Sequence, residues 1–245
     1  MASIPMSGKS ISHLPYTIDE MADRHHFYEN HWKRVGLNLL LQHAGDIAGW
    51  RLLDYGSGRG ETMDYASRLG MQTFGLDSDP RCVELSSRYG SAELLDIHQA
   101  ANQVKPNSYE VVACFHVLEH VDNPKAVLAM LGRAATEYVI VAVPNLQRIP
   151  NLRKPHAQPA DCNSGHLQSW DHAHFKNLAE NHCGLQLVDW ANDATIVPVA
   201  SELIRRLLGN KAIIGLETGL FRQLFPYWGI SVLALLKPDK SMNKA

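Results

Sequence analysis

A glycine-rich turn stands near the start of the most regular region of the chain. A strand predicted over Arg51–Tyr55 runs directly into Gly56, Ser57, Gly58 and Gly60, and a helix is predicted to follow. Glycine adopts positive φ without steric cost and lets a ligand lie against main-chain atoms. The amino-terminal end of the following helix attracts negative charge. This arrangement of strand, glycines and helix predicts a ligand-binding turn.

The acid before the glycines indicates the kind of ligand. Asp54 precedes the first glycine by two residues, and the glycines follow the spacing G-x-G-x-G. Enzymes that bind dinucleotides use G-x-G-x-x-G, with a pyrophosphate beside the turn. A carboxylate at that place would repel a pyrophosphate, whereas it suits the ammonium group of a methionine moiety. The spacing and the acid together favour S-adenosylmethionine over a nicotinamide cofactor.

A second acid ends the next predicted strand. Asp77 follows a strand predicted over Gln72–Leu76 and stands seventeen residues after the last glycine of the turn. In a doubly wound sheet this position lies beside the first turn, where a carboxylate can accept hydrogen bonds from both ribose hydroxyls. The alternative is that Asp77 caps the next helix, but Asp79 fits that role better. We therefore assign Asp77, with the adjacent Ser78, to the cofactor.

These motifs resemble the class I methyltransferase superfamily, in the group that includes ubiquinone-biosynthesis methyltransferases. The resemblance covers roughly Trp50 to Trp190. It implies a Rossmann-like fold, S-adenosylmethionine as the cofactor and methyl transfer as the reaction. It also implies that Asp54 and the three glycines form the first motif of the family, and that Asp77 binds the ribose.

Two further segments take their roles from the same resemblance. Asp96 and Ile97 fall where family members carry an acid that hydrogen-bonds the adenine amino group, so both are expected at the adenine. Phe115 and His116 begin a segment similar to the fourth motif of the family. The first residues of that motif lie against the methionine part of the cofactor, so Phe115 and His116 are expected there.

The segment from His116 to His120 also has the spacing H-x-x-E-H, a zinc pattern of some proteases. That pattern needs both histidines on one turn of an established helix, whereas here they follow a predicted buried strand. Related ubiquinone methyltransferases place a divalent metal near this motif, but we assign no metal ligand in this chain. We expect Glu119 and His120 to orient the turn by hydrogen bonds to backbone amides.

Histidines are the candidates for a general base, because their side chains titrate near neutral pH. His116 lies in the motif expected beside the methyl group, and His166 and His172 lie in the polar segment after the fifth predicted strand. The alternative is that His166 and His172 are surface residues. Methyl transfer needs no base if the acceptor is an amine deprotonated on binding or an acidic phenol, because proximity then supplies most of the rate.

Composition and charge restrict the partners and the compartment. The 245 residues carry 23 basic and 25 acidic side chains, a net charge of −2, and basic residues gather only in short stretches. A protein that binds nucleic acid usually shows a basic excess, so nucleic acid is not the expected partner. The four cysteines stand far apart, which indicates free thiols in a reducing compartment. Because no segment resembles a signal peptide or a membrane span, we expect a soluble, cytoplasmic protein.

The order of elements predicts an α/β fold with a seven-stranded, mostly parallel, doubly wound sheet whose last strand is antiparallel. Asn123 is expected to cap one of the helices. Further strands are predicted over 93–95, 110–115, 138–143, 185–190 and 230–236, and helices over 61–69, 80–88, 124–135, 170–181 and 201–208.

The chain is expected to divide into an arm, a catalytic domain and an insertion. Residues 1–16 read as a flexible arm, and residues 17–190 with 229–238 read as the methyltransferase domain, with the helix 17–45 as a lid. Residues 191–228 are far longer than a usual connection, so we interpret them as an inserted lid or cap. Six aromatic residues could line an acceptor pocket, although half of them are expected to belong to the core instead: Tyr28, Trp32, Trp170, Phe221, Tyr227 and Trp228.

The sequence thus predicts transfer of a methyl group from S-adenosylmethionine to an oxygen, nitrogen or carbon nucleophile of a small molecule. One alternative is a lipid-linked or glycan acceptor at a membrane surface, because the insertion is apolar, and peripheral membrane contact stays open. An alternative of another class is an NAD(P)-dependent oxidoreductase on a similar sheet. The sequence leaves the acceptor and the oligomeric state undetermined.

Overall fold

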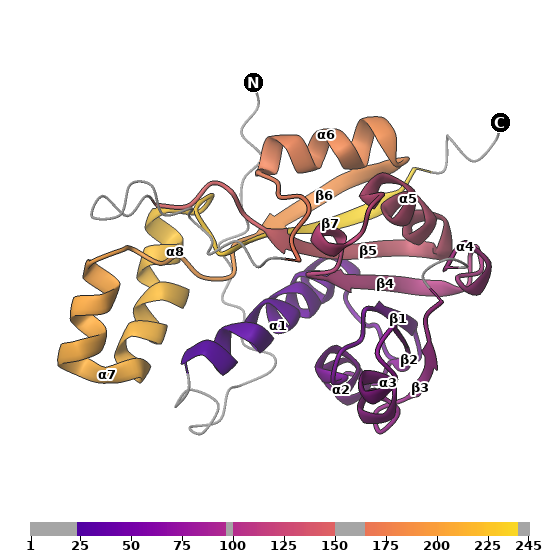
Figure 1. The fold of residues 1–245 in the computed structure, drawn as a ribbon, viewed down its shortest axis with the longest axis horizontal. Helices are drawn as coiled ribbons and strands as arrows, with labels where there is room; N and C mark the ends of the chain where they lie inside the picture. Colours follow the sequence, from indigo (N-terminus) through magenta and orange to yellow (C-terminus); the bar gives the residue numbers. More distant parts are fainter. Residues whose placement is uncertain (1–23, 97–99, 150–164, 240–245) are drawn as a thin grey trace.

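The computed structural model describes residues 24–96, 100–149 and 165–239. Seven strands form its centre, and helices lie on both sides of them (Figure 1). The strands are β1 (Arg51–Tyr55), β2 (Gln72–Asp77), β3 (Ser91–Leu94), β4 (Tyr109–Phe115), β5 (Ala135–Pro144), β6 (Leu185–Ala191) and β7 (Ser231–Pro238).

Helices of very different length connect the strands. The α-helices are α1 (Arg24–Ala44), α2 (Glu61–Arg68), α3 (Pro80–Ser86), α4 (Ala100–Gln103), α5 (Pro124–Ala134), α6 (His172–His182), α7 (Ala200–Thr218) and α8 (Leu220–Leu224), and Leu118–His120 form a short 3-10 helix.

The sheet has the strand order β3-β2-β1-β4-β5-β7-β6. β1 pairs in parallel with β2 and β4, and the parallel pairing continues from β2 to β3 and from β4 to β5. β7 runs antiparallel between β5 and β6. The predicted doubly wound sheet with an antiparallel last strand is therefore confirmed. The strand order reverses between β1 and β4, which is where such sheets bind ligands.

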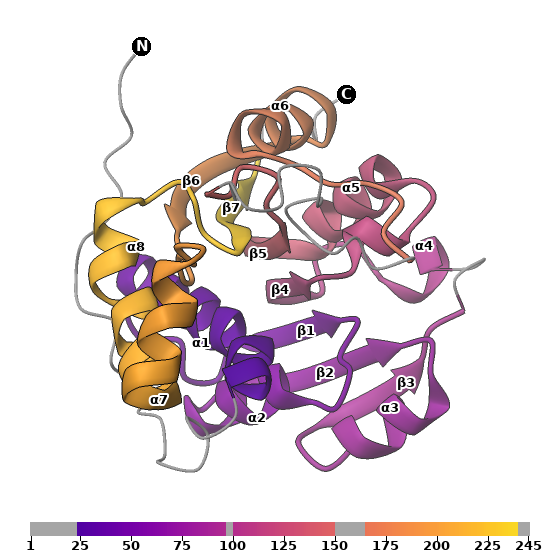
Figure 2. The same ribbon diagram turned by 60° about the vertical axis from the view of Figure 1, so that its left-hand side comes forward.

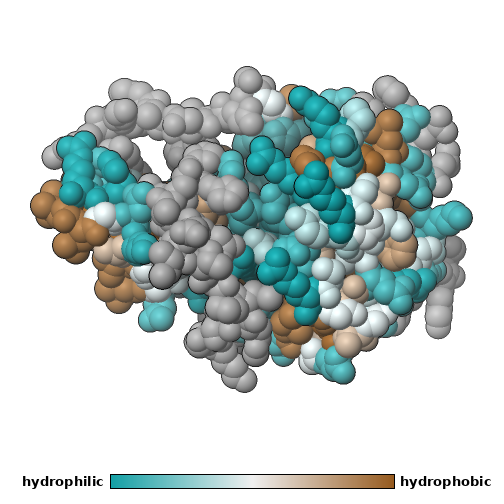
Figure 3. All heavy atoms as spheres, turned by 90° about the horizontal axis from the view of Figure 1, so that it is seen from below, coloured by the Kyte–Doolittle hydropathy of each residue, from teal (hydrophilic) through white to brown (hydrophobic). Residues whose placement is uncertain are grey.

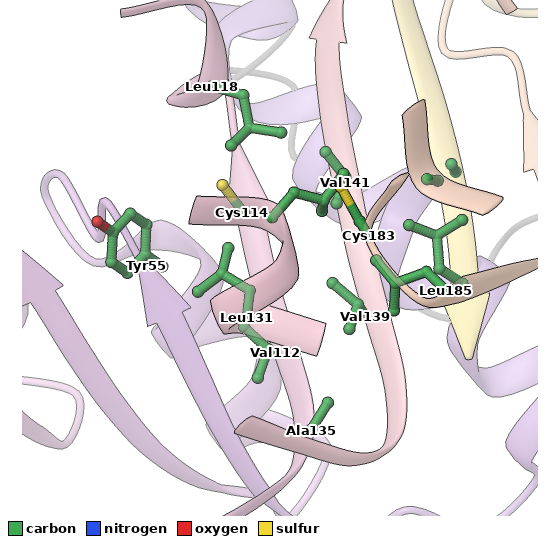
Figure 4. Close-up of a cluster of buried hydrophobic side chains, with 14 of the residues drawn as sticks. Tyr55, Val112, Cys114, Leu118, Leu131, Ala135, Val139, Val141, Cys183 and Leu185 are labelled. Atoms are coloured by element: carbon green, nitrogen blue, oxygen red, sulfur yellow. The ribbon is translucent and has the colours of Figure 1, made fainter. Parts of the chain in front are cut away.

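The central strands are buried on both faces. Along β5, Val139 and Val141 pack toward α5 and α6, whereas Ile140 and Ala142 pack toward α1. Figure 4 shows Val139 and Val141 beside Leu131 of α5. A parallel strand between two helical layers has no polar face, so its sequence is a continuous apolar run.

The predicted helix caps are confirmed. The Asp79 side chain accepts a hydrogen bond from the Arg81 backbone N–H at 2.9 Å, at the start of α3. The Asn123 side chain accepts one from the Ala126 N–H at 3.0 Å, at the start of α5. Each bond satisfies a backbone donor that the first helical turn leaves without a partner.

Four helices differ from the expectation. α6 begins at His172, two residues late, because Asp171 caps it and Trp170 pairs with the segment after β5. α7 is interrupted after the predicted end by Gly209, whose φ of 81° and ψ of 178° are not helical, and a second helical piece continues to Thr218. α4 and α8 were not predicted, since four or five residues show no periodicity. Residues 1–23 and 150–164, including the predicted arm, lie outside the described residues.

α7 and α8 lie side by side and project from one end of the sheet (Figures 1 and 2). Ile214 of α7 packs against Phe27 and Tyr28 of α1. The Tyr28 hydroxyl donates a hydrogen bond to the carboxylate of Glu217. We call residues 199–228 the α7–α8 lobe. The division of the chain into a domain and an inserted lid stays a prediction.

Among the described residues, no helix combines the length and the apolar character needed to cross a membrane.

The caps give a test of local stability. Asn123→Ala removes the side-chain acceptor for the Ala126 N–H, so the free energy of unfolding should fall by about 1 kcal/mol. Asn123→Ser is the matched control, because serine caps equally well and should retain the parental value. Urea denaturation measures both. Equal losses in the two variants would show that Asn123 acts through something other than the cap.

Candidate functional site

The glycine turn follows β1 and enters α2. Gly56, Gly58 and Gly60 all have positive φ, at 81°, 54° and 88°. A Cβ at Gly56 would approach Val117 Cγ2 to 2.3 Å, and one at Gly60 would approach Ser86 Cα to 2.8 Å. At Gly58 no atom would lie within 4 Å of such a Cβ. The outer glycines are thus needed for packing, and the middle one leaves space for a ligand against the backbone.

Asp77 ties the end of β2 to this turn. Its Oδ2 accepts a hydrogen bond from the Gly58 N–H at 2.8 Å, and its Oδ1 accepts one from the Asp79 N–H at 2.9 Å. A carboxylate oxygen has two lone pairs, so each oxygen can accept one further hydrogen bond. Ser78 is exposed beside it. This geometry is compatible with the predicted ribose contact.

Asp54 is a buried carboxylate below the turn. It is only 1% exposed, and neither of its oxygens has a hydrogen-bond partner of standard geometry. Burial raises the pKa of Asp54 to about 7, and the nearby Lys33 ammonium opposes this rise. A buried carboxylate without a partner is costly and gains from a cation placed against it. The side chain therefore fits the ammonium group of S-adenosylmethionine.

A cleft of about 340 Å³ opens at the turn, between α1 and the ends of β1 and β4. Lys33 of α1 bridges to Glu61 of α2 at 2.8 Å. Its ammonium group carries the charge needed to bind the carboxylate of a methionine moiety. The residues that line the cleft are Glu29, Asn30, Trp32, Lys33, Gly56, Gly58, Arg59, Glu61, Phe115 and His116.

Sequence reasoning missed Lys33 as a candidate cofactor residue. Lys33 stands twenty-one residues before Asp54, on a helix with no recognisable motif. Only the packing of α1 across the strand ends brings the two side chains together. No signal in the sequence predicts this contact.

His116 is held at both ring nitrogens. Its Nδ1 lies 3.0 Å from Glu119 Oε1, and its Nε2 lies 3.0 Å from Ser231 Oγ. Glu119 is fully buried, and the ring of His116 lies 4.4 Å from that of Trp32. With an ionised Glu119, which can only accept, and a neutral ring, Nδ1–H would donate to Glu119 and Nε2 would accept from the Ser231 hydroxyl. The expectation that Glu119 bonds backbone amides is wrong, because its side chain turns to this histidine.

A second histidine pair lies next to Glu119. The ligand atoms of Glu119, His120 and His166 lie within 4.8 Å of one another. His120 Nδ1 bonds the Gly165 carbonyl at 2.9 Å rather than a backbone amide, while Glu119 Oε2 and His166 Nδ1 are buried without hydrogen-bond partners. Burial lowers the pKa of His166. These three side chains could hold a metal ion, and the assignment of no metal ligand stays a prediction.

His172 lies at the start of α6 among aromatic rings. Its ring is 5.0 Å from that of Trp190 and 5.5 Å from that of Tyr227. Burial lowers the pKa of His172 to about 4, and the carboxylates of Asp171 and Asp193 oppose this shift. The side chain is therefore neutral at neutral pH and could accept a proton only from a strong acid.

The remaining predicted residues lie at this edge of the sheet, in the core or outside the described residues. Phe115 is buried at the end of β4 and also lines the cleft. Asp96 is exposed after β3, where its backbone N–H donates to Gln103 Oε1 at 2.8 Å. Ile97 lies outside the described residues. Trp32 is the one predicted acceptor aromatic that lines this cleft, and Trp170 packs in the core.

The chain is similar to known methyltransferases. A family model described as a methyltransferase domain matches residues 22–189. The ubiquinone biosynthesis O-methyltransferase of Serratia proteamaculans is 36% identical over 98 residues, 38% of this chain and 41% of that protein. That of Vibrio cholerae is 33% identical over 98 residues, 38% and 40% of the two chains. The chain thus matches about two fifths of the length of these relatives.

Solved structures show the same fold. The methyltransferase in the complex with the Trm112 activator from Haloferax volcanii has a TM-score of 0.60 and 17% identity, with 90% of this chain and 96% of that chain covered. The magnesium protoporphyrin IX methyltransferase of Synechocystis, with bound S-adenosylhomocysteine, has a TM-score of 0.58 and 13% identity, with 92% and 89% covered. At this identity the likeness concerns the fold.

Asp77→Ala should weaken binding of S-adenosylhomocysteine by about tenfold or more. It removes two ribose hydrogen bonds, each worth roughly 0.5–3 kcal/mol. Asp79→Ala is the matched control, because it removes a helix cap but no proposed cofactor contact and should leave affinity near the parental value. Calorimetry measures both. Unchanged affinity in Asp77→Ala would reject the ribose assignment.

Asp54→Asn tests the buried carboxylate through pH. Folding raises the pKa of Asp54 from 3.8 to about 7, so the folded state keeps a proton that the unfolded state has lost. Stability should fall as pH rises from about 4 to about 7, and asparagine should lack this loss. The variant should be more stable than the parent at neutral pH, by at most about 4 kcal/mol. Urea denaturation between about pH 4 and 8 measures the difference.

The same variant should bind the cofactor less well. Ionisation of Asp54 near pH 7 should raise the affinity of the parent for S-adenosylhomocysteine, because the ionised carboxylate attracts the ammonium group. Asparagine has no charge to gain, so the affinity of the variant should be lower and nearly independent of pH in this range. Identical pH profiles would show that Asp54 does not contact the ammonium group.

Proposed function

The chain belongs to the class I methyltransferase family, whose cofactor is S-adenosylmethionine, and we propose that it methylates an oxygen, nitrogen or carbon nucleophile of a small-molecule acceptor. The observation that carries this proposal is the buried carboxylate of Asp54 below the glycine turn, whose oxygens have no hydrogen-bond partner of standard geometry. Asp77 stands beside the same turn, and Lys33 lies across the cleft from it. Separate groups for the ribose, the ammonium and the carboxylate of the cofactor thus gather around one glycine turn.

When bound, S-adenosylmethionine supplies an electrophilic methyl group on a sulfonium sulfur. The side chains of this chain bind and orient. Asp54 and Lys33 carry charges opposite to those of the methionine moiety, and Asp77 accepts hydrogen bonds from the ribose. His116, held by Glu119 and Ser231 and in tilted ring contact with Trp32, forms part of the wall of the cleft. Alignment of the acceptor against this wall supplies most of the rate.

The candidate bases differ in their readiness to take a proton. His116 would have to release the Ser231 hydroxyl before its Nε2 could accept one. His172 has its pKa lowered to about 4, which makes it a weak base. His166 retains a buried Nδ1 without a hydrogen-bond partner. Among the three, His166 therefore has the surroundings best suited to a general base.

We favour a small-molecule acceptor that is methylated on a reactive oxygen. The aligned relatives are named O-methyltransferases of ubiquinone biosynthesis. The cleft volume falls in the range usual for small-molecule sites. The net charge of −2 gives no electrostatic support for nucleic acid as the acceptor.

The NAD(P)-dependent alternative has less support from the site. The buried carboxylate of Asp54 below the turn would repel the pyrophosphate of a dinucleotide. Division of the chain into a catalytic domain and lids formed by α1 and the α7–α8 lobe is part of the proposal. α1 contributes Glu29, Asn30, Trp32 and Lys33 to the cleft, which supports its role as a lid.

Transfer can be tested without knowledge of the acceptor. The protein should bind S-adenosylhomocysteine and not NADH in calorimetry. With S-adenosylmethionine labelled in its methyl group and a cell extract, label should enter the small-molecule fraction. Label found only in protein or nucleic acid would overturn the small-molecule assignment, and binding of NADH alone would overturn the reaction.

Single replacement of His116, His166 and His172 by alanine tests the base. Loss of a positioned base should slow turnover by about 10²–10⁴-fold with the cofactor still bound. We expect this loss for His166→Ala. Activity of the parent should fall at acid pH, below the ordinary histidine pKa of 6.5, because burial lowers the pKa of His166.

His174→Ala is the matched control for this series, because His174 lies on the exposed side of α6 and pairs with Asp171. It should turn over at the parental rate. Parental rates in all three test variants would show that none of these histidines is the base. An acceptor that needs no deprotonation in the site, such as an amine, would then replace the oxygen acceptor in the proposal.

A further inference from the structure

The α7–α8 lobe carries most of the exposed apolar side chains of the described residues. Seven of the eleven large ones lie between 199 and 227. We define the outer patch as five leucines of the lobe, each at least half exposed. They are Leu203, Leu207, Leu208, Leu220 and Leu224, with exposures of 56%, 71%, 68%, 50% and 60%.

The packing of the lobe does not use the outer patch. Ile213, Ile214 and Glu217 are the buried side of α7, and Ile214 joins the cluster formed with α1. None of the clusters of buried residues in the described chain includes a leucine of the outer patch. Brown apolar atoms accordingly gather on the surface at the left end of Figure 3, the end that the lobe occupies in Figure 1.

Basic side chains accompany these leucines. The lobe contains four basic residues and two acidic ones, whereas the whole chain has a net charge of −2. One acid, Glu217, is buried and bonded to Tyr28. The other, Glu202, pairs with both Arg205 and Arg206, so two positive charges share one negative charge. The surface of the lobe is therefore apolar and positive in an otherwise acidic chain.

We propose that the α7–α8 lobe docks on the surface of an anionic lipid bilayer, with the outer patch in the interface and the basic residues against the headgroups. Leucines beside arginine and lysine are the composition of helices that lie in this interface. Anionic headgroups attract nearby basic side chains. In this proposal the lobe lies on the surface of the bilayer and does not cross it.

The positive charge of the lobe favours an anionic lipid surface over a second copy of the chain as its partner. A two-fold interface places the same patch on both subunits, so the positive lobe would face itself. Like charges brought together in this way oppose association. An anionic lipid surface instead complements the apolar and the basic parts of the lobe together.

The docking surface lies one helix away from the cleft. Tyr28, which bonds Glu217 of the lobe, is followed on α1 by Glu29, Asn30, Trp32 and Lys33, which line the cleft. A lobe fixed at a bilayer would thus hold the mouth of the cleft near the lipid surface. The docking itself does not depend on the identity of the acceptor.

Flotation with lipid vesicles tests the docking. The intact chain should float with vesicles that contain phosphatidylglycerol, less with pure phosphatidylcholine, and less with either kind at high salt. Leu207→Ser with Leu208→Ser should weaken binding to the anionic vesicles by about tenfold or more, because the variant lacks two exposed leucines that docking would bury in the bilayer interface. Arg206→Glu with Lys211→Glu should remove the preference for anionic lipid.

Leu94→Ser is the matched control, because Leu94 is 53% exposed on the edge strand β3 and does not belong to the lobe. It should float like the parent. Thermal melts show whether each variant is folded. Absence of parental binding to anionic vesicles, or equal binding by the control and the double leucine variant, would overturn the proposal. So would a dimer in size-exclusion chromatography that the leucine changes dissociate while vesicle binding stays unchanged.

Discussion

Parallel pairing of β1 with both β2 and β4 brings the carboxyl ends of three strands to one edge of the sheet. Asp77 and Phe115 stand at two of these ends, and the glycine turn follows the third. The turn can pass between them only because its glycines adopt positive φ and two of them pack tightly against Val117 and α3. The strand order thus sets the position of the candidate cofactor site, and the side chains then supply its binding groups.

The second constraint is the charge buried at that edge. Asp54 has lost water on folding and has gained no hydrogen bond of standard geometry in exchange. Its raised pKa measures this cost, because burial favours the protonated form. A cationic ligand group offsets the cost, whereas a neutral or anionic one does not. The proposed contact with the ammonium group and the instability of the free carboxylate therefore have the same cause, the burial of Asp54.

α1 joins two parts of the molecule that are remote in sequence. Its middle contributes Trp32 and Lys33 to the cleft, and its first turns pack against the α7–α8 lobe through Phe27 and Tyr28. The Trp32 ring also lies on His116, which Ser231 of β7 holds from the other side. A shift of α1 would therefore change the wall of the cleft and the position of the lobe together.

The sequence by itself indicated a mostly parallel, doubly wound sheet with an antiparallel last strand, the glycine turn, the caps at Asp79 and Asn123, and the place of Asp77 beside the turn. These features rest on local spacing, backbone conformation and the handedness of strand–helix–strand connections, all of which neighbouring residues determine. Only the tertiary structure decided that Lys33 faces the cleft and that Glu119 holds His116. These contacts join residues of different elements, and their side-chain directions depend on packing across the sheet, which no spacing in the sequence records.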